Sequence, residues 1–426
     1  MKFEVVTIFP EIFDSFLQGS LLGKAIDRGL IEVAFSDPRD FTADRHRTVD
    51  DTPFGGGDGM VLKPEPWVAA IEAAQARSPN AHRVALTPAG QPIRQADLRR
   101  LAQRESLVLV CGRYEGFDER ILGYVDQQLS LGDFVLNGGE VPAMALIDGI
   151  ARLIPEVIGN PGSLGEESHQ DGLLEYPQYT RPREFRGAAV PEVLLGGDHQ
   201  KVADWRTSQR LTRTLERRPE LFRRHRLSER ERQLFAMPAG RVYLALVHHP
   251  VYDKAQQLVT TALTNLDLHD IARSSRTFGL GGYFVITPIT AQRQLAERIV
   301  GHWQSGHGAI HNPHRQQALS LVRVLPNVAS MVEQLTENIG KKPLVVGTTA
   351  RRRSGQVAAD TLLTRLATDE SAVILMGTGW GLADELLEQC DLVLTPIEGQ
   401  SGYNHLSVRS ATAILLDRLF GLRDQS

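Results

Sequence analysis

The chain has 426 residues, which is too long for one hydrophobic core and predicts two or three domains. Hydrophobic residues make up 42% and charged residues 23%, as in ordinary soluble proteins, and no apolar run approaches the ~20 residues of a membrane-spanning helix. Two cysteines cannot build a disulfide framework in a chain of this size, so we expect reduced thiols and a cytoplasmic protein. We also expect no signal peptide and no membrane contact. The net charge of −4 argues by itself against a nucleic-acid partner.

Short apolar runs alternate with helical patterns over the first 160 residues. The predicted strands are residues 3–9, 31–35, 84–86 and 107–110, and the clearest predicted helices are residues 65–76 and 96–104. Strands that alternate with helices favour a parallel sheet with helices on both faces. Residues 1–160 are therefore predicted to form one α/β domain.

A basic helical segment follows. Residues 161–238 are expected to form an exposed linker and a small helical domain. Between Lys201 and Arg232 there are eleven Lys or Arg residues against five Asp or Glu residues, although the whole chain is acidic. Four arginines are spaced to share one helical face: Arg206, Arg210, Arg213 and Arg217. A solvated surface helix is the plainer explanation, but the one-sided excess favours contact with phosphates.

The alternation of strands and helices begins again near residue 239. About five strands are predicted, at residues 242–247, 283–286, 344–346, 373–376 and 392–394. Residues 239–426 therefore form a second predicted α/β domain. Both α/β domains end in the same order, with a strand, a glycine-rich turn, another strand, and a glycine-rich loop that leads into a helix.

Glycines, carboxylates and arginines are most concentrated between Ser106 and Thr180. An apolar strand leads into residues 111–120 (CGRYEGFDER), and residues 130–140 (SLGDFVLNGGE) follow soon after. Glycines near strand ends let one backbone pass close to another, or to a flat ligand, because no Cβ atom is in the way. A carboxylate and an arginine beside such a cleft can remove a proton and stabilise an oxyanion. The pattern indicates an enzyme.

Residues 1 to about 235 resemble the bacterial tRNA (guanine-N1)-methyltransferases that modify guanosine 37. Five motifs carry the resemblance in the right order: residues 49–60, 111–120, 131–139, 151–152 and 171–182. That family belongs to the SPOUT methyltransferases. The resemblance therefore implies an α/β fold whose parallel sheet carries a deep trefoil knot, followed by a small helical domain. It also implies methylation of N1 of guanosine 37 in tRNA with S-adenosylmethionine as the methyl donor.

The resemblance implies that the cofactor is bent and is contacted largely by backbone groups. Carried onto this sequence, the cofactor positions are Leu86, Thr87, Pro88, Gly112, Tyr114, Gly116, Ser130, Leu131, Gly132, Asp133, Phe134, Val135, Leu136, Gly138 and Gly139. Backbone amides and carbonyls can read an adenine edge, while glycines keep the wall of the site thin. Taken one at a time, each glycine is explained by a turn alone. The family also suggests a requirement for Mg²⁺.

For catalysis the resemblance nominates Asp171 as the general base and Arg152 as its electrophilic partner. Guanine N1 carries a proton at neutral pH and becomes a good nucleophile only when that proton leaves. Its removal moves negative charge toward O6, where a guanidinium stabilises it, and the sulfonium methyl group then transfers in line. We expect the loop around Asp171 to become ordered only when tRNA binds. Without the resemblance, an Asx turn is the simpler role for Asp171.

The resemblance also implies a homodimer whose active site forms between two subunits. Asp50 and Glu115 are the expected readers of the target base, since carboxylates accept hydrogen bonds from guanine N1–H and from the exocyclic amine. The side chains expected to hold the anticodon stem by its phosphates are Arg181, Arg206, Arg210 and Arg213.

The second α/β domain leaves several functions open. Residues 376–382 (MGTGWGL) follow a strand, and Glu398 lies about 20 residues further on, as in dinucleotide-binding turns of NAD-dependent oxidoreductases. Against this, Leu382 is neither Gly nor Ala, and the turn follows a late strand. Residues 395–408 instead resemble the closing motif of SPOUT RNA methyltransferases, which implies a second SPOUT-like domain. A second RNA methyltransferase, for example a ribose 2′-O enzyme, and a non-catalytic RNA-binding domain both fit.

No metal site is expected. The histidines at 302, 307, 311 and 314 do not form a helical ligand pair with a carboxylate partner. The three consecutive arginines at 351–353 are expected either to touch RNA phosphates or to lie in a solvated loop.

Overall fold

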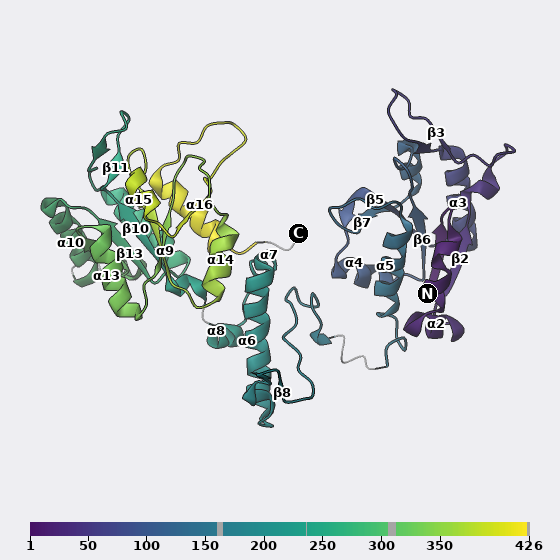
Figure 1. The fold of residues 1–426 in the computed structure, drawn as a ribbon, viewed down its shortest axis with the longest axis horizontal. Coiled ribbons are helices and arrows are strands. Elements are labelled where there is room, and N and C mark those ends of the chain that lie inside the picture. Colours follow the sequence, from purple (N-terminus) through teal and green to yellow (C-terminus); the bar gives the residue numbers. More distant parts are fainter. Residues whose placement is uncertain (160–164, 236, 306–311, 424–426) are drawn as a thin grey trace. The chain divides into compact units, whose positions relative to one another are not determined.

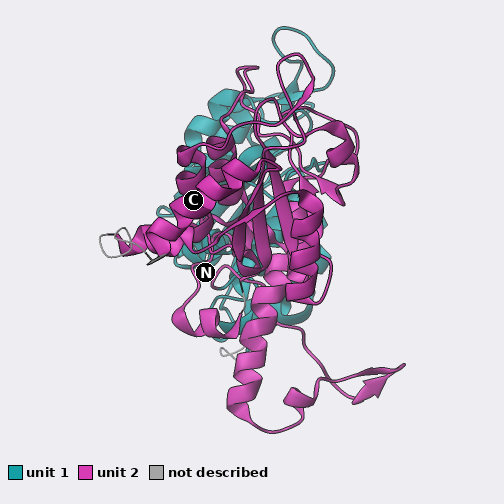
Figure 2. Cartoon of the chain, turned by 90° about the vertical axis from the view of Figure 1, so that its left-hand side faces the viewer, with its two compact units in different colours: residues 1–170 teal, residues 171–426 magenta. Residues whose placement is uncertain are grey.

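The computed structural model describes residues 1–159, 165–235, 237–305 and 312–423. The chain forms two compact units, Met1–Gln170 and Asp171–Ser426, which are teal and magenta in Figure 2. The expected division into residues 1–160, 161–238 and 239–426 is finer than this and stays a prediction. The expected linker residues Asn160, Pro161 and Gly162 lie outside the described residues. Within the described part of the chain, no helix is long and apolar enough to cross a membrane.

Unit 1 is built on a five-stranded parallel sheet in the order β2-β1-β6-β5-β7 (Figure 1). Its strands are β1 (Lys2–Val6), β2 (Glu32–Ser36), β5 (His82–Pro92), β6 (Ser106–Cys111) and β7 (Gln127–Ser130). The predicted alternation of strands and helices is confirmed. The further strand expected between the glycine-rich turn and the glycine-rich loop is also present as β7, although the sequence pattern does not give its bounds.

The opening strand is shorter than expected. It ends at Val6 rather than at Phe9. The Thr7 hydroxyl accepts a hydrogen bond from the Phe9 backbone N–H at 3.0 Å, which turns the chain out of the sheet. Pro10 then begins a 3₁₀ turn, where its missing N–H costs nothing.

Side chains alternate along the strands of unit 1 between two buried cores. On one face, Phe3 and Val5 of β1 pack with four helices, three that lie between strands in the sequence and one that follows the last strand. These helices are α1 (Asp14–Gln18), α2 (Ser20–Asp27), α4 (Gln95–Ala102) and α5 (Glu140–Ala151). On the other face, Val6 packs with Trp67 and Ile71 of α3 (Pro64–Arg77). Helices therefore cover both faces of the sheet, as predicted.

A hairpin projects from the sheet of unit 1. Its strands are β3 (Asp50–Asp51) and β4 (Val61–Leu62), which pair antiparallel. The glycine-rich residues 53–60 form the connection between them. The hairpin is fixed to the turn after β6, because the Leu62 N–H donates to the Gly116 carbonyl at 3.0 Å.

The basic segment at the start of unit 2 is helical, as predicted. Its helices are α6 (His199–Arg217), α7 (Pro219–Phe222) and α8 (Glu229–Leu234), preceded by the small hairpin of β8 (Glu184–Phe185) and β9 (Ala188–Ala189). A small core formed by Leu173, Leu211, Leu215, Phe222 and Phe235 holds them together. The guanidinium of Arg223 lies 2.6 Å from Asp360 in α14 (Ala359–Ala367) and donates to the Arg418 carbonyl, so the segment is joined to the rest of unit 2.

The second sheet has six parallel strands in the order β14-β13-β10-β16-β15-β17. Its strands are β10 (Val242–Val247), β13 (Gly282–Ile286), β14 (Val322–Leu325), β15 (Leu344–Gly347), β16 (Ala372–Gly377) and β17 (Leu392–Val393). The five predicted strands are confirmed. The sixth, β14, is a four-residue edge strand that contains Arg323, and its sequence pattern does not indicate a strand.

Helices again cover both faces of the sheet. One core includes Leu268, Leu363 and Leu416 and is formed with α9 (Asn265–Thr277), α10 (Thr290–Ser305), α12 (Pro313–Leu319), α14 and α16 (Val408–Phe420). The other includes Met331 and Leu387, from α13 (Val328–Ile339) and α15 (Asp384–Glu388). A short antiparallel pair, β11 (Val251–Tyr252) and β12 (Leu258–Val259), follows β10.

The two sheets share one topology. The order β13-β10-β16-β15-β17 in unit 2 repeats the order β2-β1-β6-β5-β7 in unit 1, strand for strand along the chain. The strand β14 is an addition at the edge of the second sheet. The sequence similarity between the ends of the two α/β domains is therefore matched by the connectivity of their strands, while the trefoil knot stays an expectation.

Candidate active sites

Three segments of unit 1 line one cavity at the ends of β6 and β7. They come from β5, from the turn after β6, and from the loop between β7 and α5. Thirteen of the fifteen positions expected to bind the cofactor line it: Leu86, Thr87, Pro88, Gly112, Tyr114, Gly116, Ser130, Leu131, Phe134, Val135, Leu136, Gly138 and Gly139. Gly132 and Asp133 are outside this lining, and their role stays a prediction.

The segments can meet only because backbone lies directly against backbone. The Gly139 N–H donates to the Gly112 carbonyl at 2.8 Å. A Cβ atom at position 139 would lie 2.6 Å from Cys111 Cα and 2.9 Å from Gly112 N, and atoms do not approach that closely. The sequence indicates this crowding only through the glycines themselves.

A buried ion pair lies at the edge of this cavity. Glu140, the first residue of α5, is 1% exposed, and its Oε2 lies 2.9 Å from Arg113 Nη2. The Thr7 hydroxyl donates to Glu140 Oε1 at 2.7 Å, and the Arg113 guanidinium lies 4.6 Å from the centre of the Phe9 ring. The pair joins the end of β1, the turn after β6 and the start of α5. Sequence reasoning assigns no role to Arg113 or Glu140, because no local pattern shows that they meet.

The two expected readers of the target base belong to neighbouring parts of unit 1. Glu115 lines the cavity, and its N–H donates to the Met60 carbonyl at 3.0 Å. Its carboxylate lies against Gly59, where a Cβ atom would be 2.4 Å from Glu115 Oε1. Asp50 lies in the hairpin opposite Leu62, which bonds to the turn that contains Glu115. The hairpin and its glycine-rich loop therefore lie beside the cavity.

The two expected catalytic residues each have a partner within their own unit. Arg152 follows the last residue of α5, and its Nη2 lies 2.5 Å from Glu167 Oε1 in unit 1. Asp171 begins unit 2, where its Oδ1 lies 2.5 Å from Arg210 Nη2 on α6. The same oxygen accepts a hydrogen bond from the Leu173 N–H at 3.3 Å, so the Asx turn considered for Asp171 is present.

The ion pair with Arg210 sets the acidity of Asp171. Partial burial raises the pKa of this carboxyl, but the hydrogen bond and the positive charge of Arg210 outweigh it, so the pKa lies below its ordinary value. Asp171 is therefore ionised at neutral pH, as a general base must be. Its basicity is nevertheless weakened while Arg210 remains its partner.

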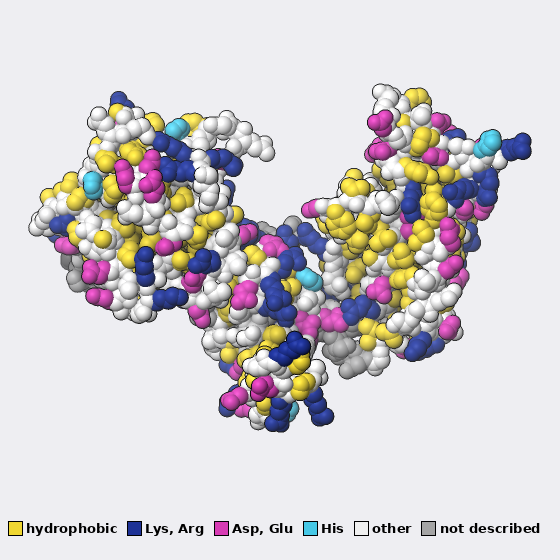
Figure 3. Space-filling model, in the orientation of Figure 1, with side chains coloured by type: hydrophobic (Ala, Val, Ile, Leu, Met, Phe, Trp, Pro, Cys, Tyr) yellow, Lys and Arg dark blue, Asp and Glu magenta, His cyan; other side chains and the backbone are white. Residues whose placement is uncertain are grey.

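The expected tRNA-binding arginines differ in what they contact. Arg206 lies over the Tyr176 ring at 4.6 Å, and Arg210 holds Asp171. Arg213 is half-buried and forms no ion pair among the residues that the structure describes, while Arg181 is exposed. Figure 3 shows dark blue Lys and Arg side chains along the helical segment of α6 to α8, which fits the predicted basic surface.

Unit 2 has a cavity at the corresponding ends of its strands. Its volume is about 930 Å³, against about 220 Å³ for the cavity of unit 1. Four segments line most of it: residues 348–351 after β15, 376–381 around the end of β16, 394–397 after β17, and 402–408 before α16. The first three of these segments follow β15, β16 and β17, which hold the positions in their sheet that β5, β6 and β7 hold in the sheet of unit 1.

The turn after β16 repeats the backbone of the turn after β6. Gly379 has φ 60° and Gly381 has φ 104°, while Tyr114 has φ 58° and Gly116 has φ 106°. The Gly381 N–H donates to the Thr378 carbonyl at 3.1 Å, and the equivalent bond in unit 1, from Gly116, is 3.0 Å. By this correspondence, Trp380 occupies the position of Glu115.

The dinucleotide-binding interpretation of residues 376–382 does not fit this geometry. The turn follows β16, the fifth strand of the six-stranded sheet in chain order, whereas the dinucleotide turn follows the first. The next helix, α15, has only five residues, so it offers a weak N-terminal dipole for a pyrophosphate.

A chain of hydrogen bonds runs from a buried histidine to the cavity of unit 2. His248 is 0% exposed; its Nδ1 lies 2.9 Å from Thr261 Oγ1, which lies 2.5 Å from Thr378 Oγ1. Its Nε2 has no hydrogen-bond partner among the described residues. Burial lowers the pKa of His248 to about 4.

We expect unit 2 to lose stability as the pH falls from about 6.5 toward about 4. In that window the unfolded His248 takes up a proton and the folded one does not, so the loss reaches at most about 3 kcal/mol. His248→Asn retains a donor or acceptor near Nδ1 and cannot titrate. Urea unfolding gives the free energy of unfolding at about pH 7.5 and at about pH 5, and the difference between these two free energies should be smaller for the variant than for the unchanged chain. An equal difference would contradict the assignment.

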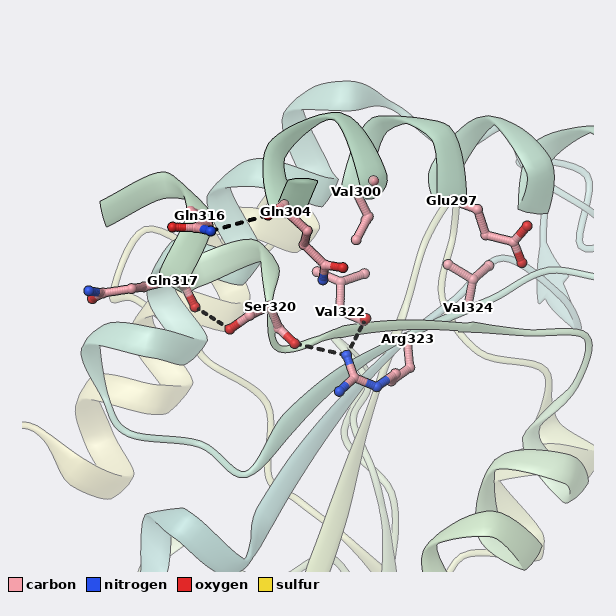
Figure 4. Close-up of a pocket in the computed structure, with 10 residues that line it drawn as sticks. Glu297, Val300, Gln304, Gln316, Gln317, Ser320, Val322, Arg323 and Val324 are labelled. Carbon is pink, nitrogen blue, oxygen red and sulfur yellow. Dashed lines mark hydrogen bonds between the residues drawn. The ribbon is translucent and has the colours of Figure 1, made fainter. Parts of the chain in front are cut away.

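A further hollow in unit 2 does not have the features of a reaction site. It lies between α10, α12 and β14 and is shown in Figure 4. Its polar groups largely satisfy one another, since Gln316 donates to the Gln304 carbonyl and Arg323 donates to the Ser320 and Val322 carbonyls. Residues 306–311, which include His307 and His311, lie outside the described residues. Among the residues that the structure describes, no cluster of three His, Cys, Asp or Glu suited to a metal is found.

Two family models match the chain, one for each α/β domain. Residues 1–224 match the family described as tRNA (Guanine-1)-methyltransferase TrmD. Residues 241–421 match the family described as SAM-dependent RNA methyltransferase. The second match favours an S-adenosylmethionine site over a NAD site in unit 2.

Curated relatives extend this similarity to the full length. A protein of Nitratidesulfovibrio vulgaris (strain Hildenborough) named tRNA (guanine-N(1)-)-methyltransferase is 45% identical over 428 residues, covering 99% of this chain and 99% of its own. A protein of the same name from Oleidesulfovibrio alaskensis (strain G20) is 45% identical with the same coverage. A third, from Gloeobacter violaceus, is 58% identical over 224 residues, which are 52% of this chain and 98% of its own. The second α/β domain is thus shared with some of these relatives and not with others.

Proposed function

The chain belongs to the tRNA (guanine-1)-methyltransferase family and is an enzyme of that kind, and from this premise we propose that unit 1 methylates N1 of guanosine 37 in tRNA. The observation that carries the proposal is the cavity of unit 1, which is lined by thirteen of the positions expected to bind S-adenosylmethionine. Its lining is mostly glycines and apolar side chains, and it includes Glu115, with the Asp50 hairpin beside it for the guanine edge.

S-adenosylmethionine supplies an electrophilic methyl group when bound. The residues of the chain then position the acceptor, take its proton and exclude water. Tyr114, Phe134 and Val135 are exposed apolar side chains around the cavity, so a ligand can cover them. The backbone amides of the loops offer hydrogen bonds to a purine ring. These features fit a flat, partly charged ligand.

We propose that Asp171 removes the N1 proton and that Arg152 stabilises charge on O6. The ion pairs of the two residues suggest how tRNA prepares the site. A phosphate that draws Arg210 away from Asp171 raises the pKa of this carboxyl and strengthens it as a base. An anionic guanine oxygen can likewise replace Glu167 as the partner of Arg152. Ordering of the loop around Asp171 would then accompany tRNA binding.

The assembly around this chemistry is also proposed from the family. We infer a homodimer in which Asp171 of one subunit meets the cavity of the other, and a trefoil knot in the chain between β5 and α5. The close approach of Gly139 to Cys111 and Gly112 supports such a threaded arrangement of the loops. A cytoplasmic location and a requirement for Mg²⁺ are further expectations of the family assignment.

The test of this proposal compares two tRNA transcripts that differ at one base. Transcripts with guanosine or adenosine at position 37 are incubated with the chain and labelled S-adenosylmethionine, and the methylated nucleoside is identified after digestion. We expect 1-methylguanosine from the first transcript and none from the second. A guanosine-37 transcript without 1-methylguanosine, or equal amounts of 1-methylguanosine from both transcripts, would rule out the assignment of unit 1.

We propose a second S-adenosylmethionine-dependent RNA methyltransferase site in unit 2. The repeated strand order and the matched φ angles of the turns after β6 and β16 favour it over a non-catalytic role. Calorimetric titration of the full chain should then show two S-adenosylmethionine molecules per chain and no binding of NAD. Saturation at one molecule per chain would contradict a second site.

A further inference from the structure

Three aromatic side chains that contact one another lie at the cavity of unit 2. Trp380 is 53% exposed and Tyr403 is 71% exposed. The ring of His405 lies between them, with centroids 5.9 Å from the Trp380 ring and 5.3 Å from the Tyr403 ring. Trp380 and His405 line the cavity itself, and Tyr403 lies between the lining residues Gly402 and Asn404. Both contacts are edge to face, with interplanar angles of 70° and 65°, so the rings do not form one flat surface and each exposed ring offers its own face to a flat group.

The position of Trp380 points to what stacks there. The turn that carries it has the backbone of the unit 1 turn, in which Glu115 is the expected reader of the guanine edge. A carboxylate reads a base by accepting hydrogen bonds from its edge, whereas an indole offers only a face and one N–H donor. The second site therefore recognises a base by stacking, which tolerates different bases. Its acceptor need not be guanine.

The charges at the cavity suit a nucleic acid. Arg351 lines the cavity, and its Nη2 donates to the neutral amide oxygen of Gln256 at 2.6 Å. The neighbouring Arg352 and Arg353 are each paired with a carboxylate, those of Glu398 and Asp384. Of these three arginines, Arg351 alone has no carboxylate partner among the described residues, so its positive charge can pair with a phosphate.

The size of the cavity allows two ligands together. At about 930 Å³ it is several times larger than the cavity of unit 1, at about 220 Å³. The segments after β15, β16 and β17 correspond to the cofactor segments of unit 1, and the aromatic side chains lie on residues 380 and 403–405. Trp380 holds the position of Glu115, the expected base reader of unit 1, so its ring borders the space in which an acceptor base would lie beside the cofactor.

We propose that unit 2 binds unpaired RNA by stacking bases on the exposed rings of Trp380 and Tyr403, which both contact His405 edge to face, with Arg351 at an adjoining phosphate. The inference rests on the proposed function of unit 2 as an RNA methyltransferase. Single-stranded RNA fits because its bases can be turned out of a helix, whereas a base in a duplex keeps its faces covered.

The test measures binding of a fluorescently labelled single-stranded RNA of about 12 nucleotides to the full chain saturated with S-adenosylmethionine. Trp380→Leu and Tyr403→Leu are expected to weaken binding by about 5- to 150-fold each, since one stacked base contributes about 1 to 3 kcal/mol. Trp380→Phe and Tyr403→Phe keep a ring and should stay close to the unchanged chain. Leu295→Ala, at an exposed leucine of α10 outside the cavity lining, is the control and should have no effect.

The other outcomes each overturn the proposal in a distinguishable way. Equal RNA affinity for the Leu variants, with two S-adenosylmethionine molecules still bound per chain, would reject stacking and leave the methyltransferase function intact. Uptake of one S-adenosylmethionine per unchanged chain would reject the second site itself. Leu variants that become monomers in sedimentation, with unchanged RNA affinity, would show that the rings cover a second copy of the chain.

Discussion

Asp171→Asn is expected to lower the rate of N1 methylation by about 10²- to 10⁴-fold, the usual contribution of a general base. The amide has the size of the carboxylate and can still accept hydrogen bonds from Leu173 and Arg210. It cannot take a proton from guanine N1, so the chemical step should slow while S-adenosylmethionine binding is retained. Single-turnover kinetics with a guanosine-37 transcript separate the rate of methyl transfer from the affinity for tRNA.

Asp204→Asn is the matched control for this variant. Asp204 lies on α6 and pairs with Arg230 at 2.5 Å, so the same change removes an arginine–carboxylate pair from the same unit. It should leave methyl transfer close to normal, because the pair lies at the surface and contributes little. Turnover by Asp171→Asn within a few-fold of the unchanged chain would mean that another group takes the proton.

Gly139→Ala is expected to weaken S-adenosylmethionine binding in unit 1 by about 10- to 100-fold, because overpacking costs about 1 to 3 kcal/mol. The added methyl group would lie 2.6 Å from Cys111 Cα and 2.9 Å from Gly112 N, and both atoms belong to the backbone. The loop must move away, which breaks its hydrogen bond to Gly112 and opens the cavity wall. Calorimetry should then show one tight site per chain, that of unit 2.

Gly132→Ala provides the comparison for this effect. A Cβ atom at position 132 would also be close to a neighbour, at 2.7 Å, but that neighbour is the ring of Phe134, which is exposed and can turn away. Its cofactor affinity should stay near that of the unchanged chain. If both variants bound S-adenosylmethionine equally well, contact between the two backbones would not be what shapes the site.

Much of the architecture follows from local sequence patterns. The alternation of apolar runs predicts the strands of both sheets except β14, and the spacing of the four arginines predicts the helix α6. The strand β14 is a four-residue edge strand that contains Arg323, so its pairing depends on the neighbouring strand β13. The family motifs indicate thirteen residues of one cavity because glycines mark places where backbones meet.

The two α/β sheets, the basic helix and the glycine-bordered loops are legible in the sequence, because side-chain periodicity and turn chemistry act between residues close in the chain. Three relations are visible in the folded chain alone: Glu140 pairs with Arg113, Arg210 lowers the pKa of Asp171, and Trp380 occupies in one unit the position that Glu115 occupies in the other. These relations join residues brought together by strand order and helix packing. The pattern of apolar and polar residues within one segment does not predict which distant segment it will contact.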